Sequence, residues 1–98
     1  MVRRFGVFEF HPDVTLTEID EVFLTMKSME GQIDGLLSME YGPYNGSEGL
    51  NGDFSHGCIM TFTDEAARDA YLQHPVFEEV KAYVVSKLTN YLMFDFKV

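Results

Sequence analysis

The residues with most scope for proton transfer in this 98-residue sequence are one tyrosine and one histidine. Tyr71 stands at helical spacing from Ala67, and its hydroxyl needs a hydrogen-bond partner if it is buried. His56 opens a run with the alternation of a β-strand, on the same face as Cys58. Imidazole titrates near neutral pH and a phenol can donate a proton, so His56 and Tyr71 are the candidate acid/base residues.

Each candidate also has a structural interpretation. A lone histidine at a strand edge is commonly a hydrogen-bonded structural residue, and Tyr71 is equally compatible with a place in the core. His74 precedes Pro75, which favours a helix start over a catalytic base. The histidines at positions 11, 56 and 74 lack metal-ligand spacing, so no metal is predicted. The glycines of residues 44–53 lack phosphate-loop spacing, so no nucleotide site is indicated, and no cofactor is predicted. Cys58, the only cysteine, cannot form an intrachain disulfide and is expected in the core.

Composition limits the possible partners. The formal net charge is −9, which disfavours binding to nucleic acid and to anionic membranes, because both need clustered Lys and Arg. Apolar residues make up 46% of the chain, enough for one packed domain over residues 1–98. No signal peptide and no membrane-spanning apolar run is recognisable, so a cytoplasmic protein is expected.

The first half of the chain predicts a strand, a helix and a second strand. Arg3–Phe10 alternates with apolar residues on both faces, as in a sheet that is covered on both sides. Thr15 and Glu18 form a capping-box pattern, so a helix should begin near Leu16 and end near Gly31. Its apolar face is expected to hold Ile19, Val22, Phe23, Met26 and Met29. The second strand is predicted over Leu36–Tyr41, with Gly42-Pro43 stopping it.

The second half repeats this pattern after a glycine-rich loop at Tyr44–Asp53. A strand around residues 55–62 leads to a helix capped at Thr63-Asp64, and Pro75 divides the helical region in two. Apolar residues at helical spacing run from Val76 to Leu88, and a last strand is predicted over Thr89–Lys97.

This order is β-α-β-β-α-β, a ferredoxin-like α+β fold with a four-stranded antiparallel sheet. Helices cover one face of such a sheet. The apolar second face of the first and last strands therefore needs another cover, and a second copy of the chain is the simplest one.

Short motifs along the whole chain resemble the stress-responsive dimeric A/B-barrel (Dabb) domain family. They are Phe8-Glu9-Phe10, Tyr41-Gly42, Phe54-Ser55-His56-Gly57, Ala70-Tyr71-Leu72-Gln73-His74-Pro75 and Phe94-Asp95-Phe96. The resemblance implies a homodimer in which two sheets face each other as a barrel. It also implies a cleft in each subunit between the sheet and its helices.

Some plant members of that family are polyketide cyclases that use a Tyr–His pair in the cleft. The resemblance places Tyr71 at the tyrosine, but Phe77 at the histidine and Arg4 at a second cleft histidine. Phenylalanine cannot exchange a proton, so cyclase activity is not expected.

The sequence thus favours a small homodimer that binds a hydrophobic or aromatic molecule, without established catalysis. The alternatives are a cofactor-free oxygenase, isomerase or cyclase-like enzyme using His56 and Tyr71, and a purely structural dimer with a filled cleft. The residues expected to line the cleft are Arg4, Gly6, Phe8, Val22, Phe23, Met26, Met39, Cys58, Met60, Tyr71 and Phe77.

Overall fold

A computed structural model describes all of residues 1–98. The elements, in chain order, are β1 (Val2–Phe10), α1 (Leu16–Lys27), the short 3₁₀ helix η1 (Ser28–Gly31), β2 (Leu36–Pro43), β3 (His56–Phe62), α2 (Glu65–Leu72), α3 (Pro75–Val85) and β4 (Leu88–Lys97). This order confirms the predicted ferredoxin-like α+β fold, with the second helical region divided into α2 and α3.

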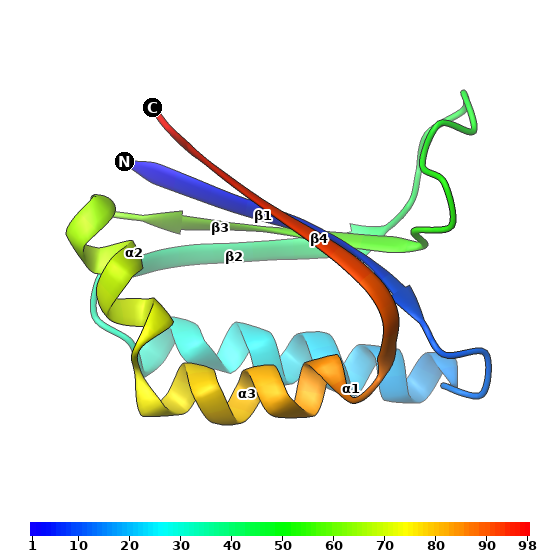
Figure 1. Cartoon of the computed structure of the whole chain (residues 1–98), viewed down its shortest axis with the longest axis horizontal. Helices are drawn as coiled ribbons and strands as arrows, with labels where there is room; N and C mark the ends of the chain where they lie inside the picture. The colour runs from blue at the N-terminus through cyan, green and yellow to red at the C-terminus, as the bar shows by residue number, and fades with distance from the viewer.

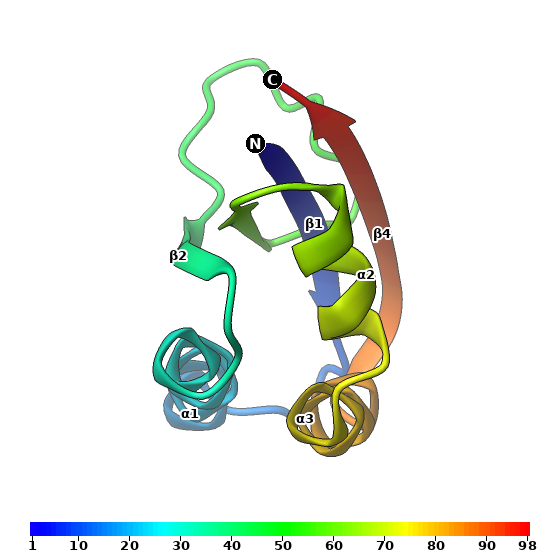
Figure 2. The same ribbon diagram turned by 90° about the vertical axis from the view of Figure 1, so that its left-hand side faces the viewer.

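The sheet has the strand order β2-β3-β1-β4, and every neighbouring pair is antiparallel. The register places Arg4 of β1 opposite both Met60 of β3 and Asp95 of β4. Directly opposed residues point to the same face of a sheet, so these three side chains share one face. The helices α1 and α3 run side by side under that face, and α2 closes one end (Figure 1, Figure 2).

Each α-helix begins at a side chain that caps its backbone. Thr15 and Glu18 form the predicted capping box at α1, and Asp64 accepts a hydrogen bond from the Ala67 N–H at α2. At α3 the Nδ1 atom of His74 accepts the N–H two residues later, at 3.1 Å. Such caps stabilise a helix by about 1 kcal/mol each. His74 is therefore a helix-start residue, as its place before proline predicts.

The core lies between the sheet and the helices. The predicted apolar face of α1 is buried in it, as is Met29 of η1. The largest fully buried side chains are Tyr71, Phe23, Phe62, Met29, Met39, Met60, Val2 and Val22. Burying one large apolar side chain contributes about 1.5–3 kcal/mol, so this layer supplies most of the stability of a short chain.

Some boundaries in the first half differ from the sequence prediction. β1 begins one residue early, at Val2, and β2 continues through Gly42 and Pro43, although that pair is predicted to stop it. β2 lies at the edge of the sheet, where proline is tolerated because its missing N–H is not needed for a further strand. The α-helix ends at Lys27 rather than near Gly31, because the chain tightens into η1.

Leu88 also differs from the prediction, because it begins β4 instead of extending α3. The N–H of Ser86 and that of Lys87 bond back to carbonyl groups of α3, at 3.2 and 3.0 Å, and close the helix. Leu88 then pairs with Phe10 of β1 and is still buried. Its helical spacing therefore indicates correctly that it is a core residue, but not which element carries it.

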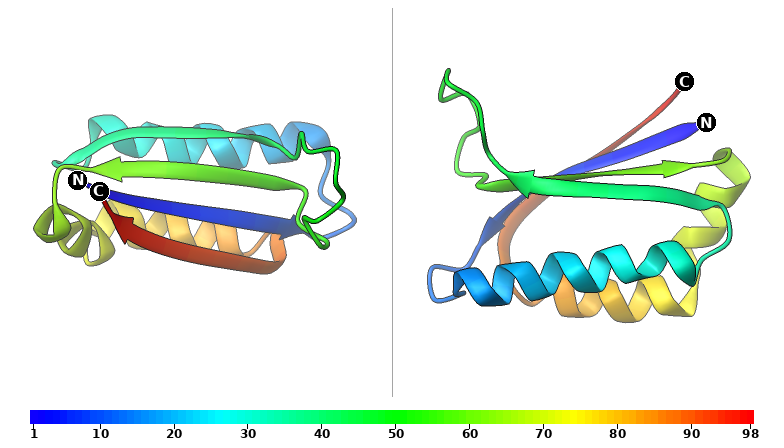
Figure 3. Two further views of the ribbon diagram at one scale, coloured as in Figure 1. Left: turned by 90° about the horizontal axis from the view of Figure 1, so that it is seen from above. Right: turned by 180° about the vertical axis from the view of Figure 1, so that it is seen from behind.

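The face of the sheet away from the helices carries exposed apolar side chains, as the two-faced pattern of the first and last strands predicts. Phe5, Leu92, Phe94 and Phe96 are all exposed there. The ring centroid of Phe5 lies 5.4 Å from that of Phe94 and 6.1 Å from that of Phe96. We call these four residues the outer apolar face. Figure 3 shows that the helices of this chain all lie on the other side of the sheet.

Candidate functional site

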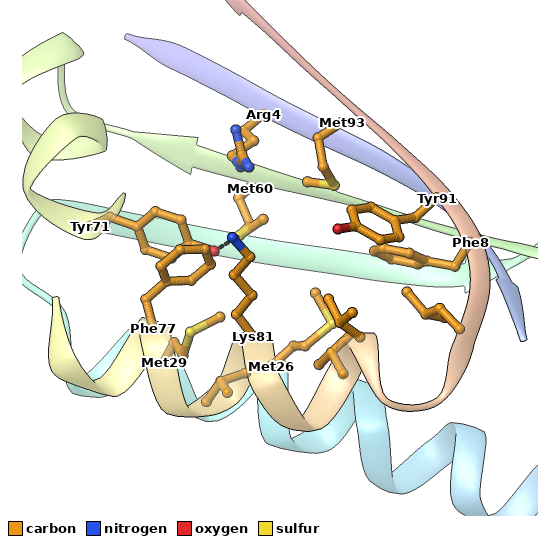
Figure 4. Close-up of a pocket in the computed structure, with 14 residues that line it drawn as sticks. Arg4, Phe8, Met26, Met29, Met60, Tyr71, Phe77, Lys81, Tyr91 and Met93 are labelled. Atoms are coloured by element: carbon orange, nitrogen blue, oxygen red, sulfur yellow. Dashed lines mark hydrogen bonds between the residues drawn. The ribbon is translucent and has the colours of Figure 1, made fainter. Parts of the chain in front are cut away.

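A cavity of about 70 Å³ lies between the sheet and α3 (Figure 4). Its walls come from β1, β3 and β4 on one side, and from η1 and the helices on the other. The lining residues are Arg4, Phe8, Met26, Met29, Met60, Tyr71, Phe77, Val80, Lys81, Val84, Val85, Leu88, Tyr91 and Met93. This cavity lies where a cleft between sheet and helices is predicted.

The structure brings together six of the eleven residues expected to line the cleft, namely Arg4, Phe8, Met26, Met60, Tyr71 and Phe77. The other five, Gly6, Val22, Phe23, Met39 and Cys58, do not line this cavity. Val22, Phe23 and Met39 are fully buried in the core under the other half of the sheet. Cys58 is also a buried core residue.

The lining residues that were not expected in the cleft from the sequence come chiefly from α3 and β4. Counting from Phe77, the positions 80, 81, 84, 85 and 88 recur at three- and four-residue spacing. That spacing is typical of one face of a helix, and Leu88 follows shortly after the helix ends. The sequence pattern therefore does indicate that these residues share one side. What the sequence does not reveal is that α3, rather than α1, forms the main helical wall.

Gly6 leaves room for the side chain of Met93, on the neighbouring strand β4, to lie close against the backbone of β1. A Cβ atom at position 6 would collide with Sδ of Met93 and lie 3.0 Å from its Cε and 3.3 Å from the Leu92 carbonyl oxygen. The side chain of Met93 therefore occupies the space that the missing side chain leaves. Gly6 shapes the cavity through Met93 without lining it itself.

Tyr71 supplies the most deeply buried hydroxyl group of the cavity. Its ring centroid lies 4.2 Å from that of Phe77 and 5.0 Å from that of Phe62, and its hydroxyl donates to Sδ of Met60 at 3.5 Å. Sulfur is a weak acceptor, so this hydroxyl is free to make a stronger bond. Burial raises the pKa of Tyr71 well above its usual value, although the positive charge of Arg4 opposes the shift. The phenol is therefore protonated throughout the physiological pH range.

Arg4 belongs to an ion-pair chain at the α2 end of the cavity. Its Nη1 atom donates to Asp95 at 2.8 Å, and the second oxygen of Asp95 accepts from Arg68 at 2.9 Å. Arg68 also pairs with the exposed Asp69. These contacts hold the guanidinium of Arg4 in place, while its buried Nε–H has no acceptor.

His56 lies in a different environment from Tyr71, at the start of β3. Its ring contacts Phe10 and Phe23, with centroid distances of 5.5 and 5.7 Å, and its Nδ1 lies 2.8 Å from the Ser55 hydroxyl. Four residues along a strand correspond to about 13 Å, which separates His56 from the Met60 position beside Tyr71. Burial lowers the pKa of His56, partly offset by Asp20. The structure thus does not bring the two candidate acid/base residues together.

The polar groups of the cavity are hydrogen-bond donors and cations rather than bases. They are the guanidinium of Arg4, the ammonium of Lys81, and the hydroxyls of Tyr71 and Tyr91. No histidine or carboxylate lines the cavity, and Phe77 stands beside Tyr71 where a base would be needed. Nor do three His, Cys, Asp or Glu side chains gather anywhere in a group that could hold a metal ion. This arrangement suits binding and orientation more than proton transfer.

None of the helices has the length and apolar character needed to cross a membrane.

Comparison with known proteins places the chain among relatives of the same fold. The stress-response A/B barrel domain-containing protein At5g22580 of Arabidopsis thaliana is 29% identical over 97 residues, covering 98% of this chain and 85% of that protein. The crystal structure of At3g17210, also from Arabidopsis thaliana, superimposes with a TM-score of 0.96 at 21% identity, over 100% of this chain and 95% of that one.

A third similar protein is a dimeric ferredoxin-like protein of unknown function from Jannaschia sp. CCS1. It superimposes with a TM-score of 0.87 at 25% identity, over 99% of this chain and 98% of that one. The model of the stress responsive A/B barrel domain matches residues 2–98, nearly the whole sequence. The chain therefore belongs to the stress responsive A/B barrel domain (Dabb) family.

Proposed function

We propose that this protein is a single-domain homodimer that binds a small hydrophobic or aromatic molecule in the cavity between its sheet and α3. The observation that carries the proposal is the cavity itself, which has mainly apolar walls and a buried, weakly bonded tyrosine hydroxyl. Ligand sites commonly combine apolar walls with a few polar groups that orient the ligand.

The size of the cavity sets a condition on the ligand. At about 70 Å³ it is smaller than the void of about 150 Å³ that holds a benzene ring in an engineered protein core. Met26, Met29, Met60 and Met93 line it, and methionine side chains adapt easily to new neighbours. Binding of an aromatic ring should therefore displace these side chains while leaving the backbone in place.

The dimer is supported by the outer apolar face and by the relative from Jannaschia, which is described as dimeric. Phe5, Leu92, Phe94 and Phe96 together form an apolar surface on a sheet that no helix covers. Packing this face against its equivalent in a second copy would remove it from water, with an expected total buried area above about 1,000 Å².

Acid/base catalysis by a His56–Tyr71 pair has no geometric support, because His56 does not line the cavity that contains Tyr71. Phe77 likewise provides no base beside that phenol. A catalyst of the cyclase type would need both a base and a donor around one substrate atom. We therefore favour binding over catalysis.

The test is a calorimetric titration with 2-phenylethanol, a neutral aromatic probe. Gly6→Ala should weaken binding at least tenfold, because the new methyl group pushes Met93 away from the sheet and into the cavity. Gly31→Ala is the matched control, since a Cβ atom there meets nothing within 4 Å.

Thermal unfolding and sedimentation should show that both variants stay folded and keep the assembly of the wild type. Absence of heat from binding in the wild type would refute the binding proposal. Equal affinity in wild type and Gly6→Ala would show that the probe occupies a different place.

A further inference from the structure

The charges that line the cavity are unlike those of the chain as a whole. The sequence has 16 acidic and 7 basic residues, yet the cavity is lined by two basic residues and by no acidic one. These two are Arg4, on β1, and Lys81, on α3. Arg4 is paired with Asp95 through its Nη1 atom, but its Nε–H and the ammonium group of Lys81 have no acidic partner, and these unpaired donors point to a ligand with a negative group.

Lys81 stands apart from the other lysines. The chain has four, and three of them form ion pairs, namely Lys27 with Glu30, Lys87 with Glu18 and Lys97 with Glu65. Lys81 has no carboxylate partner, and its Nζ lies 6.0 Å from the ring centroid of Phe77. Figure 4 shows its side chain extending from α3 past Phe77 toward the sheet, on the helical side of the cavity.

Arg4 approaches from the opposite wall, on the sheet side (Figure 4). Its side chain is only 17% exposed, and Asp95 engages its Nη1 atom. The Nε–H is buried and unpaired, which is a costly state for a polar group unless a ligand accepts the bond. Asp95 also pairs with Arg68, and it forms no ion pair with Lys81.

We propose that the cavity selects a small carboxylate with an aromatic or short aliphatic body, held between Arg4 and Lys81. Nε–H of Arg4, Nζ of Lys81 and the hydroxyl of Tyr71 would donate to the carboxylate, and the apolar body would lie among the methionines. Charged hydrogen bonds of this kind are about twice as strong as neutral ones. The inference rests on the proposed function, to which it adds the chemical class of the ligand.

The experiment compares phenylacetate with phenylacetamide, which has nearly the same shape but no charge. Calorimetry on the wild type should show phenylacetate binding at least about tenfold more tightly, as expected for added hydrogen bonds to charged groups. Lys81→Met removes the charge while keeping an unbranched side chain, and should abolish most of this preference. Lys97→Met is the matched control and should retain it, because Lys97 lies outside the cavity.

Arg4→Lys tests the other wall, because lysine keeps the charge but lacks the Nε–H. It should weaken phenylacetate binding more than phenylacetamide binding, with thermal unfolding measured to show that the variant is folded. Since Lys81 is exposed, Lys81→Met tests the proposal even if Arg4→Lys does not fold.

The outcomes separate the two proposals. Equal or tighter binding of phenylacetamide by the wild type would overturn the carboxylate inference and leave the proposed binding function intact. An unchanged preference in Lys81→Met would also overturn it. Binding of neither probe would contradict the proposed function as well.

Discussion

At the scale of single residues, burial decides what the ionisable side chains can do. Cys58 is buried between Gly6 of β1 and Tyr41 of β2, and burial raises its pKa to about 11, from an ordinary value of 9.0. The thiolate is the nucleophilic form of cysteine, so this thiol is unreactive at neutral pH. Its role is that of a small core residue, as its position on the strand predicts.

This shift gives a prediction about stability at alkaline pH. An unfolded chain releases the Cys58 proton near pH 9, whereas the folded protein keeps it up to about pH 11. The folded state therefore binds more protons within that window, and the free energy of unfolding must fall as the pH rises through it. A pKa difference of two units corresponds to a loss of about 2.7 kcal/mol in the free energy of unfolding once the pH has passed through both pKa values.

The measurement is urea unfolding of the wild type and Cys58→Ala at pH 8, 9 and 10. Between pH 8 and pH 10, the free energy of unfolding of the wild type should fall by about 1 kcal/mol more than that of the variant. Comparing the two proteins removes the contribution of Tyr71, whose pKa is also raised by burial. The same loss in both proteins would show that the Cys58 thiol is not the source of the dependence.

The sequence predicts part of the site at this scale, and the misses have physical causes. The resemblance to the Dabb family places Tyr71 and Phe77 together in the cleft, and their rings pack against each other in the structure. Gly6 is expected from the sequence to line the cleft, but only the structure shows that the side chain of Met93 fills the space beside it. The position of Lys81 opposite Arg4 depends on how α3 lies across the sheet, and no local pattern encodes that.

At the scale of the elements, Asp95 connects three segments that are distant in the sequence. It lies on β4 and accepts hydrogen bonds from Arg4 of β1 and Arg68 of α2. Its side chain is 19% exposed, so these bonds are partly shielded from water and more valuable than surface ion pairs. Asp95 thereby fixes α2, and with it Tyr71, against the sheet.

Asp95→Ala should accordingly destabilise the protein by about 2 kcal/mol or more, because it leaves the buried guanidinium of Arg4 without its partner. Asp69→Ala removes an exposed carboxylate that pairs with the same Arg68, and should change stability little. Chemical denaturation of both variants measures the difference. Equal, small effects would mean that the Arg4–Asp95–Arg68 chain does not hold α2 in place.

The order and types of the elements are predictable because each has strong local signals. The capping box at Thr15, the caps at Asp64 and His74, and the break at Pro75 all give the predicted helix starts. The errors lie at the ends of the elements. Pro43 continues β2 because an edge strand tolerates proline, and Leu88 begins β4 because it pairs with Phe10 of β1. Those endings depend on neighbours that are far away in the chain.

At the scale of the whole molecule, the outer apolar face gives the prediction about assembly. Leu92→Glu introduces a charge into this face, and burying that charge on association would be costly. The variant should dimerise at least about thirtyfold more weakly than the wild type, the effect of removing one strong interface contact. Sedimentation at micromolar concentration measures it.

Leu24→Glu is a matched control, because Leu24 is 60% exposed, as is Leu92, but lies on α1 on the opposite side of the sheet. It should leave the assembly unchanged. A wild type that sediments as a monomer, or Leu92→Glu that dimerises as well as the wild type, would contradict a dimer built on the outer apolar face.

The cavity beneath the sheet is proposed to be a ligand site whose methionine side chains adapt to the ligand. The chain has six methionines, of which Met26, Met29, Met60 and Met93 line the cavity. Met39 is fully buried but lies outside it, and Met1 is exposed. Met39 and Met1 therefore serve as internal controls within a single sample.

The most direct measurement is a titration of ¹³C-methyl-methionine protein with 2-phenylethanol, followed by NMR. If the cavity binds this probe, the methyl signals of Met26, Met29, Met60 and Met93 should shift together along one binding curve, while those of Met39 and Met1 stay in place. Shifts confined to Met39 or Met1, or no saturable shift at any of the six, would contradict the proposed ligand site.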